Sequence, residues 1–117
     1  MARRWTGPSA SERRALDELS SALKEIGFAL PGSVAVRCYP CGKPSCACHA
    51  SPPRLHGPYI QWTRRVANKT VHVNLSPEQL ADYQVFFENA RRLRELVGRL
   101  EALTISVIET DPRFNKG

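Results

Sequence analysis

The chain has 117 residues, of which 42% are apolar, and a formal net charge of +6. This length fits one domain and excludes a large enzyme with its own cofactor domain. No apolar run is long enough for a transmembrane helix, and no apolar segment follows the basic N-terminus, so we expect neither a membrane span nor a secretory signal. We therefore expect a cytoplasmic location, in which the four cysteines are metal ligands or free thiols rather than disulfides.

The basic charge is concentrated in the middle of the chain. No Asp or Glu occurs between Glu25 and Glu78, whereas this stretch holds all four Cys, all three His and six basic residues: Arg37, Lys43, Arg54, Arg64, Arg65 and Lys69. The flanking segments carry eleven basic and eleven acidic residues, so the whole net charge lies in the acid-free stretch. This distribution favours a surface that faces an anion, nucleic acid above all, over an ordinary solvated surface of mixed charge.

The N-terminal quarter predicts a basic arm followed by a helix. Residues 1–8, with Arg3 and Arg4, are expected to be flexible. Ser9 and Glu12 have the spacing of a capping box, which predicts that a helix starts there, and Gly27 is expected to supply its left-handed C-cap. An apolar stripe at spacings of three and four residues follows the cap: Leu16, Leu19, Leu23 and Ile26.

Three short strands are predicted next, at residues 33–39, 59–64 and 70–75. The second and third are joined by a link of hairpin length in which Asn68 tolerates a positive φ. Residues 40–58 hold five Pro, two Gly, three Cys and two His, so they cannot form a regular element alone. We therefore expect an α+β fold whose antiparallel sheet of two or three strands is stapled by a metal.

A long C-terminal helix is predicted from the capping box Ser76–Gln79 to about Glu109, before Asp111-Pro112. At about 1.5 Å per residue it would be roughly 50 Å long and would outreach the sheet. Apolar residues alternate along it at spacings of four and three, so its far half is covered by the N-terminal helix, by a second copy or by both. The expected homodimer interface comprises Leu93, Val97, Leu100 and Val107. Residues 9–110 are expected to form one domain, and 111–117 a tail.

The cysteines and histidines offer six candidate ligands for one tetrahedral zinc ion: Cys38, Cys41, Cys46, Cys48, His49 and His56. Short spacings let one tight turn present two ligands to the same ion. Buried free thiols are an alternative, but a Pro-rich loop has little apolar interior. A second alternative is a redox-active dithiol formed by Cys38 and Cys41. Such a motif normally lies at the start of a helix, whereas this one lies at the end of a predicted strand.

The segment Cys41-Gly42-Lys43-Pro44-Ser45-Cys46-Ala47-Cys48, followed by His56-Gly57-Pro58-Tyr59, resembles a small uncharacterised bacterial family that is often linked to mobile elements. Its members carry C-G-K-P-x-C-x-C, then H-G-P-Y, and a Leu-rich C-terminal helix. The resemblance implies the ligands Cys41, Cys46, Cys48 and His56 but no activity. Cys38 departs from the pattern and is an alternative ligand, which could displace His56.

The function expected from these features is not enzymatic. The acid-free stretch offers neither a general base beside the zinc nor carboxylates for Mg²⁺. We expect a zinc-binding, DNA-binding or DNA-associated accessory protein, with phosphate contacts from Arg64, Arg65 and Lys69 at the hairpin and further contacts from Lys43, Arg54 and Arg37. The alternative is an adaptor whose long helix docks on a recombinase, a transposase or a second copy, with a purely structural zinc.

Overall fold

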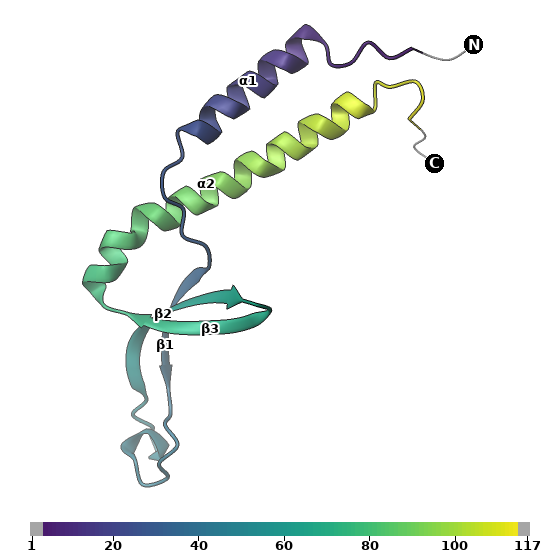
Figure 1. Cartoon of the computed structure of the whole chain (residues 1–117). Coiled ribbons are helices and arrows are strands. Elements are labelled where there is room, and N and C mark those ends of the chain that lie inside the picture. Colours follow the sequence, from purple (N-terminus) through teal and green to yellow (C-terminus); the bar gives the residue numbers. More distant parts are fainter. Residues whose placement is uncertain (1–3, 115–117) are drawn as a thin grey trace. The chain divides into compact units, whose positions relative to one another are not determined.

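The computed structural model describes residues 4–114, so the parts of the predicted arm and tail at 1–3 and 115–117 lie outside the described residues. The elements follow in the order α1 (Ala10–Lys24), β1 (Ser33–Tyr39), a short 3₁₀ helix (Ala47–His49), β2 (His56–Val66), β3 (Lys69–Leu75) and α2 (Pro77–Ile108) (Figure 1). This arrangement confirms the predicted α+β fold of an N-terminal helix, a small antiparallel sheet and a long C-terminal helix.

The chain divides into two compact units. The sheet unit is Leu30–Phe87, and the helical unit combines the residues up to Ala29 with those from Glu88 onward. α2 contributes residues to both units. The single domain expected over residues 9–110 stays a prediction.

The sheet has the order β1-β2-β3, and both strand pairs are antiparallel. The predicted hairpin has a two-residue turn in which Ala67 and Asn68 both have positive φ, of 50° and 66°. A turn with two positive φ values matches the right-handed twist of the strands that it joins. β2 begins at His56, earlier than expected, because His56 pairs with Tyr39 beyond a bulge in β1.

Alternation along the strands gives the sheet two chemically different faces. Trp62 pairs with Val34 on one side and with Val73 on the other, which places these three residues on one face. We call this the apolar face; it comprises Val34, Val36, Ile60, Trp62, Arg64, Val71, Val73 and Leu75. The opposite side is the polar face, and it comprises Ser33, Ala35, Arg37, Tyr59, Gln61, Thr63, Arg65, Thr70, His72 and Asn74.

The apolar face packs against the start of α2. The rings of Trp62 and Phe87 meet edge to face with centroids 6.2 Å apart, and the Trp62 indole donates a hydrogen bond of 2.9 Å to the carbonyl oxygen of Pro31. Leu75, which pairs with Ile60 on the same face, is buried. Burial of this face fixes the strand register, because a slip of one residue would turn Trp62 to the opposite side.

Each helix starts at a reciprocal capping box, as the sequence predicts. In α1 the Glu12 amide bonds the Ser9 hydroxyl at 3.2 Å and the Ser9 amide bonds the Glu12 carboxylate at 2.7 Å. In α2 the equivalent bonds between Ser76 and Gln79 measure 3.0 and 2.8 Å. The predicted C-cap at Gly27 is wrong: α1 ends at Lys24 with a right-handed cap at Glu25, whose amide already bonds carbonyls of the last turn.

In the helical unit, α1 runs alongside the second part of α2 (Figure 1). Its buried centre comprises Leu19 of α1 with Ala90 and Leu96 of α2. The Asn89 side chain bonds the carbonyl oxygen of Phe28 at 2.9 Å and so ties α2 to the segment that follows α1. Within the described part of the chain, no helix combines the length and the apolar character needed to cross a bilayer.

Candidate metal centre

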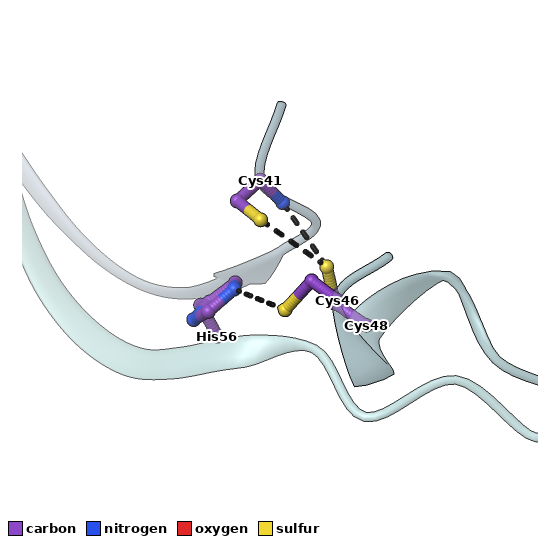
Figure 2. A group of neighbouring side chains, drawn as sticks. All are labelled: Cys41, Cys46, Cys48 and His56. Carbon is purple, nitrogen blue, oxygen red and sulfur yellow. Dashed lines mark hydrogen bonds between the residues drawn. The ribbon is translucent and has the colours of Figure 1, made fainter. Parts of the chain in front are cut away.

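Four of the six candidate ligands lie together in the Pro-rich loop that connects β1 to β2 and at the start of β2. Cys41 follows β1, Cys46 and Cys48 lie at the 3₁₀ helix Ala47–His49, and His56 is the first residue of β2. One donor atom from each residue lies within 4.8 Å of every other (Figure 2). Two strands and the intervening loop therefore converge on a single point.

The donor atoms are spaced like the corners of a small tetrahedron. The Cys41 and Cys48 sulfurs are 3.6 Å apart, and the Cys46 sulfur lies 3.3 Å from Nε2 of His56. A tetrahedral zinc ion with Zn–S bonds of about 2.3 Å requires its sulfurs to be roughly 3.8 Å apart. Three thiols and one imidazole at this spacing could bind a metal ion such as zinc, which prefers soft and borderline donors in a closed tetrahedron.

Backbone amides point at the sulfurs. The Cys41 amide donates to Sγ of Cys48 at 3.3 Å, and the Lys43 amide donates to Sγ of Cys41 at 3.5 Å. An amide that donates to sulfur favours the negatively charged thiolate, which is the form that binds a metal. The tight turn after Cys41 thus prepares the sulfurs for a cation.

The pKa values of two thiols depart from the ordinary range. The pKa of Cys46 is lowered to about 6, first by the hydrogen bond from the Cys48 backbone amide and then by the side chains of Cys48, Cys41 and His56. At Cys48 the hydrogen bond from the Cys41 backbone lowers the pKa, but burial and the neighbouring thiols outweigh it and raise the pKa overall. The pKa values of these two neighbouring thiols thus move in opposite directions, whereas a bound metal would stabilise both as thiolates.

The two remaining candidates lie outside this group. His49 is engaged elsewhere, because its Nε2 lies 2.7 Å from the Cys41 carbonyl oxygen. Cys38 lies in the β1 bulge and is exposed, with its sulfur beside Gly57 rather than beside the other thiols. The structure thus brings together the four residues that the family resemblance implies.

Comparison with known proteins places this centre in a family. Residues 10–85 match the model of a domain of unknown function, DUF6788. The chain belongs to this family. The match covers α1, the whole sheet, the candidate metal centre and the start of α2. The expectation of an uncharacterised small family is confirmed at this level. Neither the curated proteins nor the solved structures give a match to the chain.

Five of the six basic residues predicted to contact nucleic acid in this DUF6788 protein are exposed: Arg37, Lys43, Arg54, Arg65 and Lys69. Lys43 and Arg54 lie in the loop that carries the cysteines, whereas Arg65 bonds the carbonyl oxygen of Asn68 at 2.8 Å and so braces the hairpin turn. Arg64 differs, because its guanidinium lies 4.3 Å from the centre of the Trp62 ring. Its Nη1 is buried and has no hydrogen-bond partner among the described residues.

The expected dimer residues Leu93, Val97, Leu100 and Val107 all lie on α2 in the helical unit. Leu100 and Val107 line a cavity of about 150 Å³ with Pro8, Leu16 and Leu103, so they face residues of the α1 side. Val97 is 41% exposed. Only part of this stripe is therefore used within the chain.

Sequence reasoning did not place Asn74 beside Gln61 on the polar face, and it treated Arg64 and Arg65 as equivalent. Both errors have the same origin, since neighbouring residues of a strand point to opposite faces. Counting in twos from Gln61 across the hairpin turn would have placed Arg65 with the polar residues and Arg64 with Trp62.

Proposed function

We propose that this chain is a zinc-binding, DNA-associated accessory protein without enzymatic activity. The observation that carries the proposal is the joint occurrence, in one compact unit, of a Cys₃His cluster and an acid-free basic segment. The proposal keeps the bacterial origin and the link to mobile elements that the family resemblance implies, together with the expected cytoplasmic location.

A structural role for zinc is supported by the surroundings of the cluster. Three sulfurs and one nitrogen would fill all four positions of a tetrahedral ion and leave no position for a substrate. The acid-free segment also provides no carboxylate that could act as a general base nearby. The metal would hold the Pro-rich loop against the ends of β1 and β2.

Nucleic-acid binding is supported by the charge of the sheet unit. Leu30–Phe87 contains six basic residues against Glu78 and Asp82, a net charge of +4, and both acidic residues lie in α2 rather than in the sheet or the loop. Surfaces of this kind attract the phosphate backbone and release its counterions.

Salt dependence tests this proposal. The zinc-loaded protein is titrated onto labelled random-sequence DNA at several salt concentrations, starting at about 50 mM. If Arg65 and Lys69 each neutralise one phosphate, the variant carrying Arg65→Ala and Lys69→Ala loses about 1.8 from the slope of log K against log salt. The matched control, Arg91→Ala with Arg94→Ala on α2, removes the same charge outside the acid-free segment and keeps the wild-type slope. Absence of binding to duplex DNA, single-stranded DNA and RNA overturns the proposal.

A second candidate function is that of a protein–protein adaptor. It is favoured by the apolar side chains that the helical unit leaves exposed, including Val97, Ile105 and Ile108. On this view α2 docks on a recombinase, a transposase or a second copy, and the zinc only orders the loop. Such a contact should respond little to salt, which separates it from phosphate binding.

A further inference from the structure

The polar face of the sheet presents a compact set of hydrogen-bonding side chains from all three strands. β1 supplies Arg37, β2 supplies Gln61, Thr63 and Arg65, and β3 supplies His72 and Asn74. Arg37, Arg65, His72 and Asn74 are exposed, whereas Gln61 and Thr63 on the central strand are half-buried. On the opposite side Trp62 packs on Phe87, and the side chains left exposed there, Val36 and Val73, are apolar. The polar face is therefore the side of the sheet that can hydrogen-bond to a ligand.

Two amide side chains stand opposite one another at the centre of this face. Gln61 pairs with Asn74 across β2 and β3, and neither amide group has a hydrogen-bond partner among the described residues. The next pair along the ladder is Thr63 with His72, whose Oγ1 and Nδ1 lie 2.9 Å apart. The cross-strand pair Gln61 and Asn74 therefore offers free donors and acceptors beside a neighbouring pair that is already held in place.

The side-chain chemistry of the polar face matches that of base edges. Amides of Asn and Gln bond adenine in a bidentate manner, and an arginine such as Arg37 can do the same with guanine. The face contains no acidic residue that would repel phosphates. The Thr63 hydroxyl and the His72 imidazole can each donate or accept a hydrogen bond.

The dimensions of the sheet fit the major groove of B-form DNA. The groove is about 12 Å wide and admits a two-stranded ribbon such as the β2–β3 pair, which carries Gln61 and Asn74. From Tyr59 to Arg65 the central strand extends roughly 20 Å, which corresponds to about six base pairs at 3.4 Å each. The major groove of double-stranded RNA is too narrow and deep for side chains to read its bases.

The aromatic content of the polar face argues against a single-stranded ligand. Single strands are held mainly by bases stacking on exposed aromatic rings. Among Phe, Trp and Tyr, the polar face contains only Tyr59. The Tyr59 ring already lies against that of Tyr39, with centroids 5.2 Å apart. A hydrogen-bonding surface with one engaged ring is suited to a duplex.

From these observations we infer that the polar face enters the major groove of double-stranded DNA and reads base edges through Gln61, Asn74 and Arg37. This inference rests on the proposed nucleic-acid function and adds to it the form of the ligand and the reading surface. Lys43, Arg54 and Lys69, outside the face, contact phosphates and position the sheet without reading sequence.

The first experiment selects ligands for the zinc-loaded full chain from randomised duplex DNA. We expect an enriched motif of about six base pairs. Competition should then show that a duplex with this motif binds more tightly than the same sequence as single-stranded DNA or as double-stranded RNA. Equal binding to all three forms, or a preference for either of the other two, overturns the inference.

Variants of the reading residues locate the contacts. Gln61→Ala and Asn74→Ala should each reduce discrimination at one base pair of the motif by roughly 5- to 150-fold, while binding to random duplex stays near the wild-type level. Arg37→Ala should relax one position and also weaken binding generally; its matched control, Arg94→Ala on α2, should do neither. Zinc content and circular dichroism verify that each variant is folded.

The outcomes separate the inference from the proposed function. If the wild type binds no nucleic acid, both fail. If it binds every duplex equally, with no enriched motif, and Gln61→Ala and Asn74→Ala behave as wild type, the reading surface is wrong and the phosphate-binding function stands.

Discussion

Cys46 and Cys38 carry the same thiol in different surroundings. The Cys46 sulfur lies 3.3 Å from His56, and its lowered pKa of about 6 keeps it ionised at neutral pH. Cys38 is exposed in β1 and lies outside the cluster. Cys38 lies at the irregularity between Arg37 and Tyr39, where its sulfur is beside Gly57.

We predict that Cys46→Ser abolishes stoichiometric zinc binding, whereas Cys38→Ser retains one zinc ion per chain. Loss of one thiolate from a closed tetrahedral site removes a bond that the harder hydroxyl does not replace. Elemental analysis of protein purified under reducing conditions measures the stoichiometry. Equal loss of zinc in both variants would instead indicate a four-cysteine site that includes Cys38, and wild-type protein with well under one zinc would contradict the metal site itself.

Gly32 precedes β1 in a conformation that no other residue adopts easily. Its φ is +106°, and an added Cβ would lie 2.4 Å from the Thr63 carbonyl oxygen and 2.5 Å from the Trp62 indole nitrogen. The missing side chain thus lets the backbone approach β2 closely enough for Trp62 to bond Pro31. Here one residue determines how the strand enters the sheet.

Gly32→Ala is therefore expected to destabilise the sheet unit by about 1–3 kcal/mol, because it adds both backbone strain and a clash. Urea unfolding of the zinc-loaded protein measures the change in the free energy of unfolding. Gly42→Ala is the control in the same unit, since an added Cβ there meets nothing within 4 Å. Similar stability of the two variants would show that the close approach at Gly32 contributes little.

At the scale of elements, the loop between β1 and β2 depends on its cross-link more than on its backbone. It contains one short 3₁₀ helix, Ala47–His49, supported by local bonds such as that from the Arg54 amide to the Ala47 carbonyl oxygen at 3.0 Å. Cys48 is its buried residue. A segment of this composition does not bury enough apolar surface to offset its own ordering entropy.

Removal of the metal by a chelator should accordingly increase amide hydrogen exchange throughout residues 41–55. Metal binding is coupled to folding when the ligand site does not persist in the disordered chain. Mass spectrometry of proteolytic peptides follows the exchange. Peptides from α1 act as the internal control, because its capping box and Leu19 belong to the helical unit. Unchanged exchange in the loop after complete zinc removal would contradict the proposed staple.

Local signals in the sequence predicted most of these elements. Ser9 and Ser76 marked the two helix starts because capping is a contact across only three residues. Asn68 marked the hairpin because a positive φ is a property of the turn itself. The end of α1, the early start of β2 at His56 and the bulge near Cys38 were not predictable in this way, because each depends on a partner far along the chain.

In the candidate site, too, local features were predictable from the sequence and features that depend on distant partners were not. Spacing limited the metal ligands to six residues, but the choice between Cys38 and His56 depends on how β1 pairs with β2. The separation of Arg64 from Arg65 likewise depends on which face of the sheet is buried, and Phe87 in α2 decides that. Sequence therefore predicts the chemistry of the site better than its geometry.

At the scale of the whole molecule, the helical unit leaves part of its apolar surface unused. Val97 and Ile108 are both exposed, and they lie eleven residues or about three helical turns apart, so they share one face of α2. Leu96 and Ala90 form the buried centre, and Leu100 lines the cavity shared with Leu16. A two-helix unit buries one stripe and has a second available for another copy.

We predict that the protein forms a dimer through this second stripe and that Val97→Asp converts it to a monomer. Because Val97 is 41% exposed, a charge there is tolerated within one chain but costs far more inside an apolar interface. Light scattering at micromolar concentration should give twice the chain mass of 13.1 kDa for the wild type and the mass of one chain for the variant. The helical circular dichroism of the variant should be unchanged. The matched control is Val85→Asp, at a 51% exposed valine of α2 that belongs to the sheet unit, and it should remain a dimer. A wild-type mass of 13.1 kDa would show that the stripe does not support self-association, and α2 would then have to dock on a different protein for the adaptor function to hold.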